Sequence, residues 1–294
     1  MTRAKYYNPS AIVTTDWLEK HVGDENLRIF DCTTHLVQES GSSRPYRVVS
    51  GQEDYSARHI PGSGYLDLQA DFSLADSPWA MTLASTGDVA KAFEKAGVSD
   101  ETRVVLYSHN SMSWATRFWW MLHWLGFDNA AVLDGGLNKW LAEGKDVTTK
   151  VKSYLPGTLA ISPRPHIFVG REEVLCTIKD PKKCTISALG PDIYSGKVPR
   201  YGRPGRIPAS VNVPQVSLVD PKTLEFQPAE TVAQKFLAAG ADPKKRIITY
   251  CGGGIFASLN AFLLHQLGYE NVSVYDNSMS EWGQDNTLPI EADL

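Results

Sequence analysis

The sequence has few cysteines, little net charge and no long apolar run. Four cysteines in 294 residues are too sparse for a disulfide scaffold, and no CxxC spacing indicates a zinc site. The 29 lysines and arginines against 33 aspartates and glutamates leave a net charge of -4, which excludes the basic excess that nucleic-acid binding needs. No segment approaches the roughly 20 apolar residues of a membrane span or forms the core of a signal peptide. We therefore expect a cytoplasmic protein with reduced thiols and without nucleic-acid or membrane partners.

The chain repeats itself at a spacing of about 142 residues. LGFDN at 125–129 matches LGYEN at 267–271, and an aspartate and a tryptophan further on recur at the same spacing. RHIPGS at 58–63 also matches GRIPAS at 205–210. Internal repeats of this kind indicate two related structural units, and the chain is long enough for two domains with their own cores.

We predict domains at 8–145 and 166–290, joined by a proline-containing linker at 146–165. In the second half, apolar patterns predict alternating helices and strands. The predicted helices lie within 171–180, 231–240 and 257–268, and the predicted strands at 184–188, 246–250 and 272–276. Such alternation predicts an α/β fold with a mainly parallel sheet in each domain.

Cys251 lies where this pattern suits a reactive thiol. It follows the predicted strand at 246–250, three glycines come next, and a helix is expected to start near Ala257. Open α/β sheets bind ligands at this edge. Glycines let the backbone point several N–H groups inward, and the positive end of the helix adds to their effect. These surroundings favour a thiolate, so we predict that Cys251 is a nucleophile.

The first half provides an internal comparison. Ser108 occupies the position that matches Cys251, but it has no glycine cradle and no base at a recognisable spacing. We interpret the first half as a non-catalytic partner, and a site that uses His109 stays open. The remaining cysteines are interpreted as inert packing residues: Cys32, Cys176 and Cys184.

Together these motifs resemble the rhodanese superfamily, specifically the tandem-domain sulfurtransferases that act on thiosulfate or 3-mercaptopyruvate. The similarity covers nearly the whole chain. The motifs are RHIPGS at 58–63, LDGGLNKW at 133–140, GRIPASVNVP at 205–214, CGGGIFAS at 251–258 and YDNSMSEW at 275–282. The resemblance implies two tandem rhodanese-like domains, each a mainly parallel sheet flanked by helices, and an enzyme that uses no metal and no cofactor.

The resemblance also implies a two-step transfer of sulfur. Thiolate Cys251 attacks the outer sulfur of a small donor, becomes a persulfide, and passes that sulfur to a thiophilic acceptor such as cyanide, a thiol or a protein. The loop is expected to hold the persulfide anion through its backbone N–H groups. Its predicted binding residues are Gly252, Gly253, Gly254, Ile255 and Phe256. Related thiol phosphatases have a loop one residue longer, so phosphate chemistry is disfavoured.

Three arginines, Arg200, Arg203 and Arg206, precede the second IPAS motif. In the family this region lies near the catalytic cleft, where arginines bind the carboxylate or sulfonate of the donor. Arg200 lies nearest the position of a substrate arginine in mercaptopyruvate enzymes. The alternative is that the three charges only keep a surface loop solvated.

Several residues depart from both family patterns. Thiosulfate enzymes often carry Arg or Lys where this chain has Gly252, and Thr or Arg where it has Phe256. Mercaptopyruvate enzymes usually carry a hydroxyl side chain where this chain has Gly253. His59 matches a family histidine, but a structural role in closing a turn is favoured, and Ser187 replaces a common aspartate. These departures leave the choice between the two donors open.

The alternative to an enzyme is a rhodanese-like docking or redox-sensing module without turnover. Two domains can bury their mutual face within one chain and need no partner subunit, so a monomer is possible and the oligomeric state stays open.

Overall fold

The structure is a computed structural model that describes residues 5–38 and 45–293. Its first half is built on a five-stranded sheet with the order β1-β7-β6-β2-β5, in which every neighbouring pair is parallel. The strands are β1 (Ile12–Val13), β2 (Leu27–Asp31), β5 (Ser63–Tyr65), β6 (Arg103–Tyr107) and β7 (Ala130–Leu133). The central strands are almost entirely buried, as expected for a parallel sheet that is covered on both faces.

The second half repeats this sheet. Its order is β8-β12-β11-β9-β10, again parallel throughout, so each strand has a counterpart at the same place in the first sheet. The strands are β8 (Phe168–Val169), β9 (Lys183–Ser187), β10 (Val211–Asn212), β11 (Arg246–Tyr250) and β12 (Val272–Tyr275). The predicted fold of two tandem α/β domains with mainly parallel sheets is therefore confirmed.

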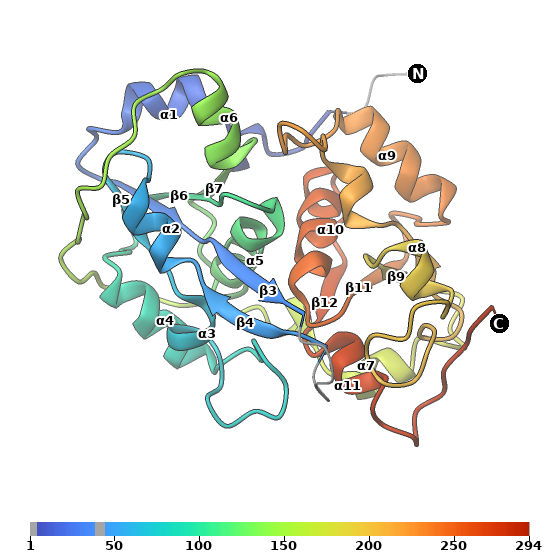
Figure 1. Cartoon of the computed structure of the whole chain (residues 1–294). Helices are drawn as coiled ribbons and strands as arrows, with labels where there is room; N and C mark the ends of the chain where they lie inside the picture. The colour runs from blue at the N-terminus through green and yellow to red at the C-terminus, as the bar shows by residue number, and fades with distance from the viewer. Residues whose placement is uncertain (1–4, 39–44, 294) are drawn as a thin grey trace.

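Helices cover both sheets, and a hairpin extends the first half toward the second (Figure 1). The hairpin consists of β3 (Thr34–Val37) and β4 (Arg47–Ser50). The helices of the first half are α1 (Thr15–His21), α2 (Gln52–Ala57), α3 (Leu68–Asp71), α4 (Thr86–Lys95), α5 (Met112–Trp124) and α6 (Gly136–Ala142). Those of the second are α7 (Arg171–Leu175), α8 (Pro191–Tyr194), α9 (Ala229–Ala238), α10 (Ile255–Gln266) and α11 (Ser278–Trp282).

The predicted elements of the second half are present, with two corrections. The helix expected near Ala257 begins earlier, at Ile255, because Gly254 takes a left-handed conformation and serves as its N-cap. The helix predicted over 171–180 ends at Leu175, so Cys176 is exposed instead of packed in the core. The interpretation of Cys176 as a packing residue is therefore wrong.

Helices α5 and α10 pack against each other where the two halves meet, and they lie side by side in Figure 1. Both helices are apolar around most of their surface, which is typical of helices buried between layers. Trp119 of α5 packs edge-to-face on Phe262 of α10, with ring centroids 4.9 Å apart. The hydrophobic core therefore continues from one half into the other.

Two aspartates at matching repeat positions join the halves reciprocally. Asp134, after β7, accepts a hydrogen bond from the backbone N–H of Phe226 in the second half at 2.8 Å. Asp276, after β12, accepts one from the backbone N–H of Leu83 in the first half at 2.8 Å. In each half, the aspartate at the matching repeat position thus accepts a hydrogen bond from the backbone of the other half.

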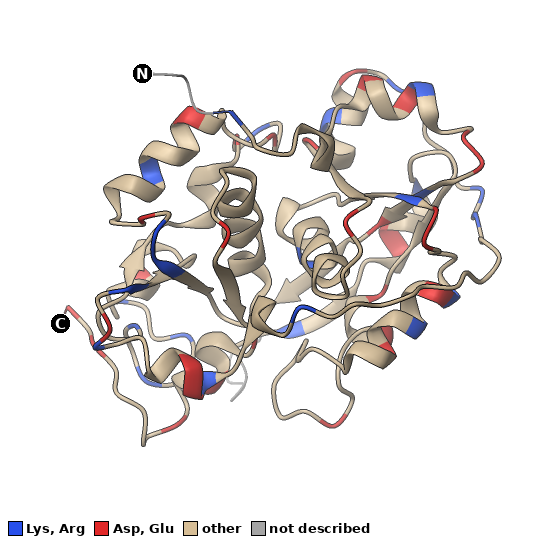
Figure 2. Cartoon of the chain, turned by 180° about the vertical axis from the view of Figure 1, so that it is seen from behind, with Lys and Arg blue, Asp and Glu red and all other residues tan. Residues whose placement is uncertain are grey.

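Acidic and basic residues are interspersed along the helices and loops of both halves (Figure 2). Within the described residues, no helix is long and apolar enough to cross a lipid bilayer.

Candidate active site

Cys251 follows the last residue of β11 and is 2% exposed. Its backbone N–H donates to Ser278 Oγ at 3.0 Å, and its carbonyl accepts from the N–H of Met279 at 3.1 Å. The carbonyl of Gly252 accepts from the N–H of Ser280 at 2.8 Å. The start of α11 therefore fixes the backbone on which the thiol stands.

Ser278 itself has an unusual backbone. Its φ is +50°, a left-handed value that costs a residue with a side chain free energy. The hydroxyl of Ser278 donates to the carbonyl of Tyr275 at 2.7 Å while it accepts from Cys251. The strained residue is thus held by two hydrogen bonds, one of which reaches the thiol-bearing residue.

The three glycines that follow are needed because neighbouring groups fill the space of a side chain. A Cβ on Gly252 would lie 2.1 Å from the Tyr201 hydroxyl, and one on Gly253 would lie 2.6 Å from the Tyr46 hydroxyl. Gly254 has φ +77°, and a Cβ there would lie 2.5 Å from the Asp276 carbonyl oxygen. The sequence interpretation explained these glycines by backbone freedom alone, whereas close approach of two phenols and a carbonyl is an equal reason.

The backbone N–H groups of residues 252–257 have no acceptor within the part of the chain that the structure describes. They lie at the N-terminus of the 12-residue helix α10, whose N-cap Gly254 provides no side-chain hydrogen bond. A helix N-terminus with free N–H groups stabilises an anion. The loop can therefore hold a negatively charged sulfur next to Cys251.

Ile255 and Phe256 belong to the first turn of α10, so the loop between strand and helix consists only of residues 251–254. Ile255 is buried, and Phe256 is half-buried and packs against the hydrophobic core. Phe256 therefore has a free backbone N–H in the first turn of α10, while its ring packs against the core.

Two buried phenols flank the thiol. Burial raises the pKa of Tyr46 to about 12, with a further rise from the charge of Cys251 and a partly offsetting hydrogen bond with Ser280. Burial also raises the pKa of Tyr201, with added contributions from Tyr46 and Cys251, while Arg200 lowers it. Both phenols therefore stay protonated at neutral pH and can donate hydrogen bonds.

The structure separates the three predicted arginines. The side chain of Arg200 hydrogen-bonds to Tyr201, whose hydroxyl lies against Gly252, so Arg200 is near the loop. The guanidinium of Arg203 donates to backbone carbonyls of residues 282, 283, 285 and 288. Arg206 forms ion pairs with Glu291 and Asp293 at 2.5 and 2.7 Å. Arg203 and Arg206 thus tie down the C-terminal segment, and the structure brings only Arg200 of the three toward the thiol.

A cavity of about 250 Å³ lies beside the loop. Its walls come from both halves of the chain: Pro45, Tyr46, Pro78, Trp79, Ala80, Ser280 and Gln284. Tyr46 and Ser280 belong both to this cavity and to the surroundings of the loop glycines. A small molecule in the cavity would therefore be adjacent to the cradle.

His59 has the structural role that the sequence favoured. It is buried, its Nδ1 lies 2.6 Å from the Tyr55 carbonyl, and its Nε2 lies 3.1 Å from the Lys150 carbonyl. Ser187, at the end of β9, accepts from the backbone N–H of Leu189 at 3.3 Å. Among the described residues, neither side chain forms a hydrogen bond to Cys251.

The matching loop of the first half is closed by its own hydrogen bonds. Ser108 Oγ donates to the Ser111 carbonyl at 2.5 Å, and His109 Nε2 lies 2.6 Å from the carboxylate of buried Asp31. The hydroxyl of Ser108 therefore points to a backbone acceptor and not to His109. This geometry does not assemble a nucleophile and a base.

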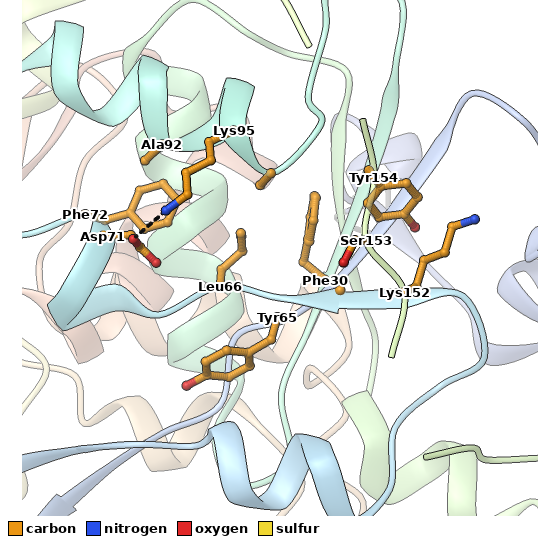
Figure 3. A pocket seen from close by; sticks show the side chains of 12 residues that line it. Phe30, Tyr65, Leu66, Asp71, Phe72, Ala92, Lys95, Lys152, Ser153 and Tyr154 are labelled. Carbon is orange, nitrogen blue, oxygen red and sulfur yellow. Dashed lines mark ion pairs between the residues drawn. The ribbon is translucent and has the colours of Figure 1, made fainter. Parts of the chain in front are cut away.

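A second pocket lies in the first half, remote from Cys251 (Figure 3). Lys152, Ser153 and Tyr154 of the predicted linker form one wall, so this part of the chain packs on the first half. Lys95 and Asp71 face each other on the opposite wall, with Nζ and Oδ1 3.6 Å apart. We assign no catalytic role to this pocket.

The sequence interpretation missed Tyr46, Tyr201, Ser278 and Arg117 at the site. Arg117 of α5 is fully buried, pairs with Asp276 at 2.5 Å, and has Nη1 3.1 Å from the Cβ position of Gly254. Tyr201 adjoins Arg200 in a segment already singled out, which was an available signal. Ser278 lies within the motif YDNSMSEW at 275–282, which was also a signal, whereas no local pattern marked Tyr46 and Arg117.

Fold and site together define a duplicated α/β protein in which a buried cysteine, Cys251, lies between a parallel strand and the N-terminus of a helix. The rhodanese-like domain family matches residues 14–143 and 197–285. The chain therefore belongs to the rhodanese-like family, and both of its halves are rhodanese domains.

Named relatives cover the chain almost end to end. The sulfur carrier protein TtuD of Thermus thermophilus is 30% identical, over 97% of this chain and 98% of its own. Thiosulfate/3-mercaptopyruvate sulfurtransferase 2 of Arabidopsis thaliana is 29% identical, over 95% of this chain and 86% of its own. The crystal structure of the 3-mercaptopyruvate sulfotransferase SseA from Escherichia coli matches with a TM-score of 0.78 and 26% identity, covering 91% of this chain and 98% of SseA.

Proposed function

We propose that this protein is a sulfurtransferase that moves a sulfane sulfur from thiosulfate or 3-mercaptopyruvate to a thiophilic acceptor through a persulfide on Cys251. The observation that carries the proposal is the set of free N–H groups of residues 252–257 around a thiol at the carboxyl edge of a parallel sheet. The names of the relatives support the same chemistry.

In the first step the Cys251 thiolate attacks the outer sulfur of the donor. A new S–S bond forms, the bond between the outer sulfur and the rest of the donor breaks, and the electron pair leaves with sulfite or with the pyruvate enolate. The thiol proton of 3-mercaptopyruvate ends on the enolate carbon, which gives pyruvate. In the second step an acceptor nucleophile attacks the outer sulfur and Cys251 leaves as a thiolate.

The loop favours this reaction because negative charge develops on the outer sulfur. Free N–H groups at the helix N-terminus are proposed to stabilise that charge, as N–H groups do for oxygen in an oxyanion hole. We propose that Gly252, Gly253, Gly254, Ile255 and Phe256 bind the outer sulfur through their backbone. Arg200 is proposed to bind the carboxylate or sulfonate of the donor, because its side chain reaches Tyr201 beside the loop. Arg203 and Arg206 are assigned structural roles.

The test is the mass of the intact protein after incubation with thiosulfate or, separately, with 3-mercaptopyruvate. We expect a gain of one sulfur atom that the substitution Cys251→Ser abolishes. Cys176→Ser is the matched control, because Cys176 is a free and exposed thiol far from the cradle and its loss should leave the gain intact. No gain with either donor would refute the proposal and favour the alternative, a docking or redox-sensing module.

The proposed partners are the small donor and the acceptor, and the proposed state is a monomer located in the cytoplasm. The shared apolar contact between α5 and α10 supports the monomer, since the chain buries its largest helical faces internally. Sedimentation at micromolar concentration tests the oligomeric state.

A further inference from the structure

Tyr46 reaches from the first half of the chain to the catalytic loop of the second. Its side chain is 7% exposed, and its hydroxyl lies 2.6 Å from the Cβ position of Gly253. Its ring packs edge-to-face on Tyr201, with centroids 6.4 Å apart and planes at 77°. A phenol from the other domain therefore fills the volume that a side chain at position 253 would occupy.

We propose that Tyr46 is a catalytic residue, whose hydroxyl donates a hydrogen bond to the outer sulfur of the Cys251 persulfide. The inference rests on the proposed function, because it assigns a role within the persulfide step. It gives the first half, which has no nucleophile of its own, a direct part in the chemistry.

The surroundings of Tyr46 suit a donor that keeps its proton. Its pKa is raised to about 12 by burial and by the charge of Cys251, so the phenol is protonated at neutral pH. A hydrogen bond with Ser280 lowers that pKa, and the ring of Tyr46 is held by its edge-to-face contact with Tyr201. Ser280 is itself fixed by its backbone N–H, which donates to the Gly252 carbonyl at 2.8 Å. The Tyr46 hydroxyl is thus positioned by contacts with the same loop that carries the persulfide.

The role needs no additional reactant. The electron pair of the thiolate forms the S–S bond, and the pair of the broken bond departs with the donor's leaving group. Negative charge remains on the outer sulfur, and Tyr46 donates a hydrogen bond to it while the proton stays on the phenol. When the acceptor takes the sulfur, the hydrogen bond is released and the hydroxyl returns to its starting state.

The direct test is Tyr46→Phe, which removes one oxygen and keeps the ring. We expect turnover to fall about tenfold, less than the roughly hundredfold or larger loss on removing an oxyanion-hole donor, because sulfur is a weaker acceptor than oxygen. In addition, the pH profile for the reaction of the isolated persulfide with an alkylating agent should shift to higher pH. Tyr107→Phe is the control, because Tyr107 is a fully buried phenol of the same half that bonds to Ser63 instead of the loop.

A second variant separates chemistry from packing. Gly253→Ser alone should impair transfer, because its Cβ meets the Tyr46 hydroxyl at 2.6 Å. In the Tyr46→Phe background that oxygen is gone, so the serine fits and its own hydroxyl can replace the phenol. We therefore expect the double variant to be more active than either single variant.

The outcomes distinguish the inference from the proposed function. If wild-type protein gains no sulfur, the proposed function fails and the inference with it. If the wild type gains sulfur but Tyr46→Phe transfers it at the same rate with an unchanged pH profile, only the role of Tyr46 is refuted. Absence of rescue in a folded double variant would likewise count against it.

Discussion

Arg117 of the first half and Asp276 of the second form an ion pair directly beside the catalytic loop. Arg117 Nη2 and Asp276 Oδ1 are 2.5 Å apart, and the guanidinium also lies over the ring of Phe168. Its Nε and Nη1 have no hydrogen-bond partner among the described residues, and Nη1 faces Gly254. A positive charge from one domain is therefore buried beside Gly254 of the other.

Breaking this pair should strongly destabilise the protein. Arg117→Met leaves Asp276 without its counter-ion, and removal of one partner of a buried pair costs roughly 3–5 kcal/mol. The free energy of unfolding in a denaturant titration measures the loss. Lys95→Met is the control, because the Lys95–Asp71 pair is largely exposed and such pairs contribute at most about 1 kcal/mol. Equal effects of the two substitutions would contradict the structural role of the pair.

Alanine substitutions at Gly254 and at Gly240 can be compared to separate the effect of a steric clash from the effect of backbone strain. Both have positive φ, +77° and +86°, so alanine costs about 1–2 kcal/mol at either position. A Cβ on Gly240 meets nothing within 4 Å, whereas one on Gly254 meets the Asp276 carbonyl at 2.5 Å. We expect Gly254→Ala to lose more stability than Gly240→Ala and to lose persulfide formation, measured by denaturation and intact mass. If the two variants match in both measurements, close approach is not what requires Gly254.

Substitution of Arg200 should weaken binding of the donor, whereas substitution of Arg203 should lower the stability of the protein. Arg200→Met is expected to raise KM for thiosulfate about tenfold, equivalent to about 1.4 kcal/mol of binding, with little change in unfolding temperature. Arg203→Met removes charged hydrogen bonds to several carbonyls and should cost about 3 kcal/mol of stability. Steady-state kinetics and thermal unfolding of both variants check this. An unchanged KM in Arg200→Met would remove Arg200 from the donor site.

Asp134 should make stability depend on pH. Burial raises its pKa to about 6, from an ordinary value of 3.8, and among the described residues it has no ion pair with an arginine like that of Asp276. The folded state therefore binds a proton that the unfolded state has lost between pH 4 and pH 6, so the stability from Asp134 falls as pH rises through this window. At neutral pH the destabilisation is at most about 3 kcal/mol.

The variant Asp134→Asn removes this titration and keeps an oxygen that accepts from the Phe226 N–H. Its stability relative to wild type should increase from pH 4 to pH 6 and stay constant above. His265, whose pKa is lowered to about 4 by burial, titrates in the opposite sense and is present in both proteins, so it cancels in the difference. A difference that does not vary with pH would show that Asp134 has an ordinary pKa.

The sequence was sufficient for the features that depend on local pattern. Buried parallel strands are short continuous apolar runs, and the 246–250 and 272–276 segments became β11 and β12 as predicted. The repeat correctly implied two related α/β units, and the structure adds that their sheets have the same strand order. Cys251 could be singled out because strand, glycines and helix follow one another along the chain.

The remaining features depend on contacts between segments that are distant in sequence. Tyr46 meets Gly253 across more than 200 residues, and Arg117 meets Asp276 across 159. The pattern of apolar and polar residues in either segment does not indicate such a contact. All three arginines of 200–206 were predicted to bind the donor, and the fold of the C-terminal segment separated Arg203 and Arg206 from Arg200.

The reciprocal hydrogen bonds of Asp134 and Asp276 join the two copies of the fold within one chain, much as an interface joins the two subunits of a heterodimer. Each copy accepts a hydrogen bond from the backbone of the other, so a displacement of one copy changes the contacts of its neighbour. The second copy carries Cys251, and the first copy supplies Tyr46 and Arg117 beside the loop that follows it. The surroundings of the thiol are thus composed by both copies, so a substitution in either one alters them.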